Sequence, residues 1–206
     1  MPLSPRTRTA ISISAGVGAF LVAALLIGFL SDQLARRTVP AVFPGLDTVR
    51  FDLEATSGVS RKNTDFLGRP AALFFGFTHC PEVCPTTLYS LNQQIRAIGT
   101  GAAPLQVIFV TVDPERDTAS VLKEYIDAIN PGAVGLTGSV EAISAMVKSF
   151  GIYAEKVPLD DGDYTMDHTA TVFLYDSRGR LDGTIAWGED ETVARRKLEN
   201  LLGLSG

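Results

Sequence analysis

Residues 71–85 read AALFFGFTHCPEVCP, and this stretch is the clearest indication of the fold. Its first part, 71–77, is apolar at every position apart from Gly76, which predicts a strand buried on both faces. Apolar residues then recur at helical spacing from about Pro85 to Ile98, and Pro85 suits the first position of that helix. The junction between them is therefore a strand–helix turn, at the edge where open α/β sheets bind ligands.

The same alternation continues toward the C-terminus. Strands are predicted at 105–112, 135–138, 152–156, 171–175 and 181–186, with a further half-buried strand at 49–55. Helices are predicted from a cap at Asp117 or Thr118 through Ile126, from Ser139 to Phe150, and from about Asp190 to Leu202. This order predicts an α/β fold with a mixed sheet between flanking helices.

Composition excludes several classes of protein. Apolar residues make up 46% and charged residues 20% of the 206 residues, which is typical of a globular chain and not of a disordered one. The net charge of −5 argues against a nucleic-acid partner. Cysteine and histidine occur only twice each, so a small disulfide-stapled domain is excluded.

The N-terminal segment predicts a membrane anchor. Residues 9–30 carry no charge, and a helix of that length spans the hydrocarbon core of a bilayer. A cleaved signal peptide and a buried core helix are the alternatives, although the apolar part of a signal peptide is usually shorter. We therefore expect a short tail at 1–8, an anchor at 9–30, a linker at 31–45 and a folded domain at 46–206. The basic residues on the two flanks balance, so orientation depends on the chemistry of the domain.

Cys80 and Cys84 are the main candidates for chemistry. Their spacing places both side chains on one face of a helical turn, close enough to hold one ion or to form a disulfide. A helix N-terminus lowers the pKa of nearby thiols and favours the thiolate, which is the form that binds metal or attacks a disulfide. Two inert buried cysteines are the plainer alternative.

The two histidines differ in their expected roles. His168 precedes a buried strand and is placed to reach the same edge of the sheet, whereas His79 is expected to point away from the sulfurs. Two thiolates and one imidazole suit Cu(I) in trigonal geometry, or zinc with an open fourth position. Met166 is expected to pack in the core.

Three polar residues follow the strand at 105–112. Asp113 is placed either to position the site or to form a turn before the proline that follows it. Arg116 and Asp117 are interpreted as a local ion pair and a helix cap.

Several motifs together resemble one family. Residues 74–88 (FFGFTHCPEVCPTTL) strongly resemble the signature of the Sco/SenC family of cytochrome c oxidase assembly proteins. Residues 112–118 (VDPERDT), 135–138 (GLTG) and 167–169 (DHT) agree in order and spacing, and the resemblance extends over about 47–203. Two departures are conservative: Glu82 stands where Asp is usual, and Thr169 where Ser is common.

The resemblance implies a thioredoxin-like copper chaperone tethered to a membrane. By position, Cys80, Cys84 and His168 would bind copper, as Cu(I) and also as Cu(II). The implied partner is the CuA site of cytochrome c oxidase subunit II, with another copper chaperone or a thiol reductase as further partners. We expect a single-pass protein of a bacterial inner membrane with its domain in the periplasm, rather than a protein of the mitochondrial inner membrane.

Two enzymatic functions compete with copper delivery. One is a thiol–disulfide oxidoreductase acting on the cysteines of the oxidase subunit or of another extracytoplasmic client, and a weaker one is a peroxidase. Thioredoxin-type oxidoreductases generally separate their cysteines by two residues and face them with a cis-proline loop. Here three residues intervene and no proline follows Pro158, while His168 occupies that region. We therefore favour a metallochaperone over an enzyme, with reduction of the oxidase thiols as a companion role.

Overall fold

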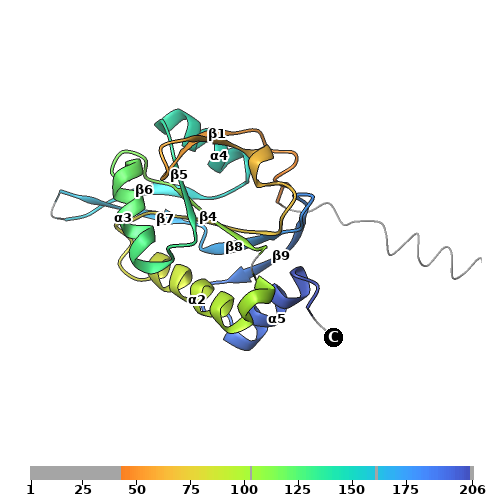
Figure 1. Ribbon diagram of the computed structural model, residues 1–206. Helices are drawn as coiled ribbons and strands as arrows, with labels where there is room; N and C mark the ends of the chain where they lie inside the picture. Colours follow the sequence, from red (N-terminus) through yellow and green to blue (C-terminus); the bar gives the residue numbers. More distant parts are fainter. Residues whose placement is uncertain (1–42, 103, 161, 205–206) are drawn as a thin grey trace, which may run out of the picture. The chain divides into compact units, whose positions relative to one another are not determined.

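A computed structural model of the chain describes residues 43–102, 104–160 and 162–204, and a mixed sheet forms the centre of this part (Figure 1). Seven strands pair in the order β2-β1-β5-β4-β3-β8-β9. They are β1 (Asp52–Ala55), β2 (Ser60–Lys62), β3 (Ala71–Gly76), β4 (Gln106–Thr111), β5 (Val134–Thr137), β8 (Thr171–Tyr175) and β9 (Leu181–Ala186).

The centre of the sheet is parallel and its edges are antiparallel. β3 pairs in parallel with β4, from Ala71 opposite Gln106 to Gly76 opposite Thr111, and β4 pairs in parallel with β5. β8 and β9 add antiparallel strands on one side, and β1 and β2 do so on the other. Every residue of β3 and β4 is buried, as their continuous apolar runs predict. Because β3 and β4 are parallel, the loops that follow them lie at the same end of the sheet.

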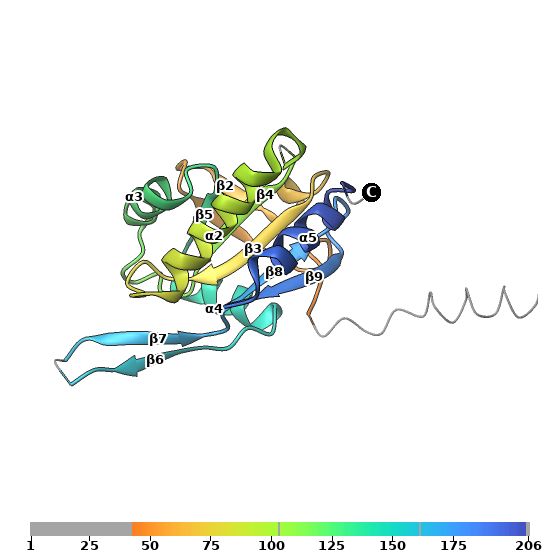
Figure 2. The same ribbon diagram turned by 90° about the horizontal axis from the view of Figure 1, so that it is seen from below.

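Helices cover both faces of the sheet (Figures 1 and 2). They are α2 (Val83–Ile98), α3 (Ala119–Ile129), α4 (Val140–Ser149) and α5 (Glu191–Leu201), together with the short 3-10 helices η1 (Asn63–Phe66) and η2 (Gly99–Ala102). α2, α3 and α5 lie on one face, and α4 lies on the other. Phe150, which follows α4, packs its ring 5.5 Å from the ring of Phe75 in β3. The core thus fills both sides of the central strands.

A second, two-stranded sheet extends from the main sheet as a hairpin (Figure 2). It consists of β6 (Ala154–Pro158) and β7 (Tyr164–His168), paired in antiparallel fashion from Ala154 opposite His168 to Pro158 opposite Tyr164. His168 is the last residue of β7 and precedes β8 by only two residues. The hairpin therefore places His168 near the end of β3.

The predicted mixed sheet with flanking helices is confirmed, with corrections at its edges. Only the second half of the strand expected at 49–55 pairs, and β2 and β7 were not expected as strands. α2 begins at Val83 instead of Pro85. Pro85 is the third helical residue, still among the first four whose N–H groups have no partner within the helix, so its missing N–H costs no hydrogen bond.

The predicted tail and anchor, and the linker up to residue 42, lie outside the described residues. Within 43–102, 104–160 and 162–204, no helix is both long enough and apolar enough to cross a membrane.

Candidate metal centre

The loop between β3 and α2 presents the two cysteines differently. Cys80 lies in the loop and is partly exposed, whereas Cys84 is the second residue of α2 and is completely buried. The backbone N–H of Cys84 donates a hydrogen bond to the Cys80 sulfur over 3.3 Å. Glu82, the N-cap residue of α2, makes no side-chain capping bond. The sulfur of Cys80 therefore takes the place of a capping oxygen at the start of this helix.

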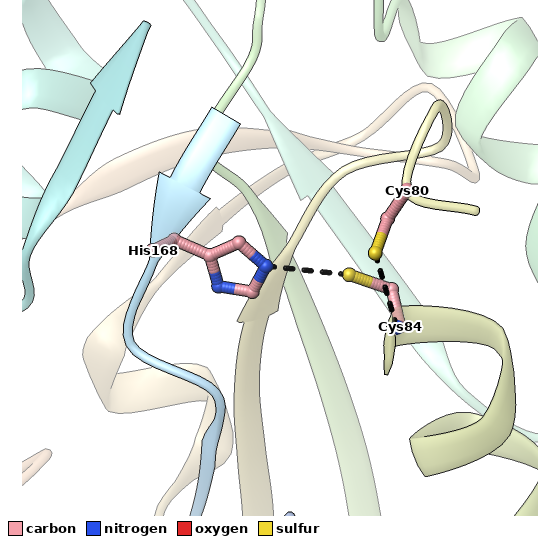
Figure 3. A group of neighbouring side chains, drawn as sticks. All are labelled: Cys80, Cys84 and His168. Atoms are coloured by element: carbon pink, nitrogen blue, oxygen red, sulfur yellow. Dashed lines mark hydrogen bonds between the residues drawn. The ribbon is translucent and has the colours of Figure 1, made fainter. Parts of the chain in front are cut away.

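His168 brings an imidazole to the same place from the hairpin. Figure 3 shows its ring and the two sulfurs pointing toward one another. Nε2 of His168 lies 3.4 Å from the sulfur of Cys84, and the three donor atoms all lie within 4.8 Å of one another. The structure thus gathers all three residues that the sequence singles out into one cluster, from a loop, a helix and a strand end.

The orientation of the imidazole is fixed on its other side. Nδ1 of His168 lies 3.1 Å from the backbone carbonyl oxygen of Thr169. Since a carbonyl only accepts, Nδ1 carries the hydrogen and Nε2 keeps a free lone pair, which is the arrangement of a metal-binding histidine. The rings of Phe74 and Phe77 stand edge-on to the imidazole, with centroids 6.2 and 5.8 Å away.

The two thiols have opposite pKa shifts. A hydrogen bond from the Cys84 thiol lowers the pKa of Cys80 to about 4, even though partial burial opposes the shift. The same hydrogen bond, together with burial, raises the pKa of Cys84. At neutral pH the pair therefore holds one proton: Cys80 is a thiolate, and Cys84 is the thiol that donates to it.

The cluster fits a soft metal ion. Bonds of about 2.0–2.3 Å, as zinc makes to nitrogen and sulfur, place ligands roughly 3.5–4 Å apart in a three- or four-coordinate site. The three donors lie within 4.8 Å of one another, which is close to that separation. A thiolate and thiol pair with one neutral imidazole is a donor set that suits Cu(I) or zinc.

The remaining histidine and the nearby methionine lie where the sequence predicts. His79 is exposed, with Nδ1 3.1 Å from the hydroxyl of Thr78, and it does not belong to the three-donor cluster. Met166 is buried in the core. Neither side chain joins the cluster among the described residues.

The interpretation of Arg116 and Asp117 is confirmed in part. Arg116 forms the expected local ion pair, with Asp113 as its partner, whereas Asp117 is not the helix cap. The cap of α3 is Thr118, whose side chain accepts from the N–H of Val121. Asp117 is instead fully buried and accepts hydrogen bonds from Thr78, in the loop after β3, and from Thr111, the last residue of β4. A local sequence pattern does not reveal these partners.

Comparisons with known proteins agree with this architecture. A sequence model of the SCO1/SenC family matches residues 45–203. The mitochondrial SCO2 homologue of Bos taurus is 36% identical over 184 residues, covering 86% of this chain and 69% of that protein. The mitochondrial SCO2 homologue of Danio rerio is 39% identical over 132 residues, covering 63% of this chain and 47% of that protein. The chain thus spans between about half and two thirds of these relatives.

A solved structure shows the same fold. The structure of Bradyrhizobium japonicum ScoI with copper bound is 38% identical and matches with a TM-score of 0.69, over 74% of this chain and 98% of that chain. This likeness confirms the thioredoxin-like α/β fold. Because the family model covers most of the sequence and the fold agrees, the chain belongs to the SCO1/SenC family.

Proposed function

We propose that this protein binds one copper ion through Cys80, Cys84 and His168 and delivers it during the assembly of cytochrome c oxidase. The observation that carries the proposal is the cluster of two sulfurs and one imidazole nitrogen within 4.8 Å of one another. Bound copper in the related Bradyrhizobium japonicum protein supports it. In our proposal Cu(I) takes two thiolates and a neutral imidazole, so binding releases the proton that Cys84 holds.

The proposed recipient is the CuA site of oxidase subunit II. Cys80 is partly exposed while Cys84 is buried, so a partner's thiolate can reach the ion from the side of Cys80. Copper then moves by exchange of one ligand at a time, and no free ion has to form. The family resemblance supports this recipient, and delivery to it supports a domain outside the cytoplasm.

Titration of the reduced full chain against a competing Cu(I) chelator tests the proposed site. We expect His168→Ala to weaken binding by at least about ten-fold, because it removes a donor atom. His79→Ala is the matched control and is expected to bind like the wild type, since His79 is exposed and outside the cluster. Equal competition by the wild type and His168→Ala would show that the histidine is not a ligand.

A companion redox role is favoured by the state of Cys80. Its lowered pKa, about 4, keeps a partly exposed thiolate ready to attack a disulfide. In such a step the Cys80 thiolate attacks a partner's disulfide and releases one partner thiolate, and Cys84 then attacks the mixed disulfide to form the Cys80–Cys84 disulfide and release the other. The two electrons come from the pair, one proton comes from Cys84, and the second proton that completes two partner thiols comes from solvent. Replacing both cysteines by serine is expected to abolish oxidase assembly in cells, while His168→Ala is expected to weaken copper binding and leave thiol exchange intact.

We further propose that residues 9–30 anchor the chain in a bacterial inner membrane with the domain in the periplasm. The length of this uncharged segment and the thiol chemistry of the domain support the proposal. We expect a reporter enzyme that works only outside the cytoplasm to be active when it is fused after Gly206. Activity of a cytoplasmic reporter at that position would contradict this topology.

A further inference from the structure

The loop after β4 contacts both the segment that leads to Cys80 and the hairpin that carries His168. This loop, Val112–Thr118, follows β4 where β4 pairs with β3, and the N–H of Val112 donates to the carbonyl oxygen of Gly76 over 2.8 Å. We call the loop that carries Cys80 the cysteine side and the hairpin that ends at His168 the histidine side. Two buried carboxylates of the loop Val112–Thr118 make these contacts: Asp117 contacts the cysteine side, and Asp113 contacts the histidine side.

Asp117 holds the cysteine side. Its side chain is 0% exposed and accepts hydrogen bonds from the N–H of Thr78 (3.0 Å), from the hydroxyl of Thr78 (2.6 Å) and from the hydroxyl of Thr111 (2.7 Å). The hydroxyl of Thr137 donates to its backbone carbonyl over 2.8 Å. Asp117 thus connects the ends of β3, β4 and β5. A buried carboxylate is costly unless its hydrogen bonds are made, so these bonds fix the position of Thr78, two residues before Cys80.

Asp113 holds the histidine side. It is 1% exposed and accepts from the hydroxyl of Tyr164 over 2.8 Å and from Arg116. Arg116 also donates to the backbone carbonyl of Tyr164 over 2.9 Å and stacks 3.7 Å above the Tyr164 ring. Tyr164 is the first residue of β7 and His168 is the last. These contacts hold the outer end of β7 against the loop after β4.

We infer that the loop Val112–Thr118 sets the placement of His168 relative to the cysteines, with Asp117 positioning the Cys80 loop and Asp113 positioning β7 through Tyr164. The two carboxylates are four residues apart on one short segment, so the two halves of the site share one support. These are positioning residues, because neither carboxylate belongs to the donor cluster. The inference rests on the proposed copper-binding function.

The roles of Asp113 and Asp117 are separated by measuring each variant in the full chain, alone and in combination with His168→Ala. Tyr164→Phe removes the hydroxyl bonded to Asp113. We expect it to weaken Cu(I) binding by about ten-fold when His168 is present and, in combination with His168→Ala, to change it by less than about two-fold. The alkylation rate of Cys80 in the metal-free reduced protein is expected to stay unchanged. Tyr153→Phe is the matched control, since the hydroxyl of Tyr153 donates to Glu155 of β6 and not to Asp113.

Asp117→Ala is expected to differ from Tyr164→Phe in both measurements. Cu(I) binding weakens by about ten-fold with or without His168→Ala, and the alkylation rate of Cys80 changes, because the loop that carries the thiolate loses its support. Asp117→Asn keeps the size and an accepting oxygen, so it is expected to restore both values to near those of the wild type. If Asp117→Ala does not fold, Thr78→Val removes the hydroxyl bond to Asp117, together with the hydroxyl contact to His79, and keeps the bond from the Thr78 N–H. It is expected to shift both values in the same direction, and His79→Ala controls for the lost contact to His79.

Specific outcomes would overturn the inference. A loss of equal size for Tyr164→Phe with and without His168→Ala would mean general loosening of the fold and would contradict a role through the histidine. An unchanged alkylation rate in Asp117→Ala would contradict the role of Asp117. Failure of the wild type to bind Cu(I) would instead remove the proposed function itself, so the two failures can be told apart.

Discussion

Cys80 and Cys84 lie four residues apart but differ in burial and in protonation. Cys84 is buried at the start of α2 and keeps its proton, while Cys80 receives hydrogen bonds from the thiol and the backbone N–H of Cys84. The free N–H groups of a helix start add positive potential at the same point. The pair therefore holds a thiolate at neutral pH before any ion or partner arrives.

Removing the thiol of Cys84 should return Cys80 toward ordinary behaviour. The pKa of Cys80 is about 4 mainly because the Cys84 thiol donates to it. In Cys84→Ala this donor is lost, and we expect the pKa of Cys80 to rise toward the ordinary thiol value of about 8.5. Thiolate absorbance followed from pH 3 to 10 measures the change. A titration midpoint that stays near that of the wild type would show that the helix N-terminus, and not Cys84, lowers the pKa.

Gly76 leaves the space that the Cys84 sulfur occupies. A Cβ atom at residue 76 would lie 2.9 Å from that sulfur and 2.8 Å from the ring of Phe109, and both neighbours are buried. We therefore expect Gly76→Ala to displace Cys84, to weaken Cu(I) binding, and to lower the free energy of unfolding by about 1–3 kcal/mol.

Gly183 in β9 provides the control for this change. A Cβ atom there would meet no atom within 4 Å, so Gly183→Ala is expected to leave Cu(I) binding unchanged. Chelator competition and urea unfolding of the two variants make the comparison. Wild-type copper affinity in Gly76→Ala would contradict the close packing of the sulfur.

At the scale of elements, an ion pair connects the end of β9 to α5. Glu189 accepts from Lys197 of α5 over 2.9 Å and from the N–H of Ala186, the last residue of β9, over 3.0 Å. Lys197 also donates to the carbonyl oxygen of Thr184 over 2.7 Å. These bonds attach the last helix to the edge strand of the sheet, on the same face as α2.

This ion pair predicts a pH dependence of stability. The hydrogen bond from Lys197 lowers the pKa of Glu189, so the folded state favours the ionised carboxylate. Its contribution is present above the pKa of the unfolded chain and is lost as the pH falls through the lower folded pKa. Glu189→Gln is expected to lower the free energy of unfolding by up to about 1 kcal/mol at pH 7, with the deficit shrinking in acid.

Urea unfolding at a series of pH values measures this difference. Glu124→Gln on the exposed face of α3 is the control and is expected to follow the wild type at every pH. A deficit for Glu189→Gln that is the same at pH 3 and pH 7 would contradict an electrostatic origin.

For the whole molecule, hydrophobic periodicity predicts the elements that are buried and misses those that are not. β3 and the central four residues of β4 are apolar, and both strands are predicted from the sequence. β2 is an exposed strand of polar residues and shows no alternation of apolar and polar positions. β7 pairs only with β6, so it depends on a contact that no local pattern records. The position of His168 beside the cysteines follows from that hairpin.

Local sequence patterns also do not predict that Asp117 supports the site. Its partners Thr78 and Thr111 are ordinary residues on two other segments, and only the parallel pairing of β3 with β4 brings them together. In contrast, the spacing of Cys80 and Cys84 at a strand–helix junction predicted their meeting from the sequence alone. Local chemistry was predictable, and support from distant segments was not.

X-ray absorption at the copper edge of the Cu(I)-loaded full chain identifies the atoms bound to copper. We expect two sulfur atoms and one nitrogen atom in the wild type, and two sulfur atoms without that nitrogen in His168→Ala. An unchanged nitrogen signal in His168→Ala, or a wild-type spectrum with fewer than two sulfur atoms, would contradict it.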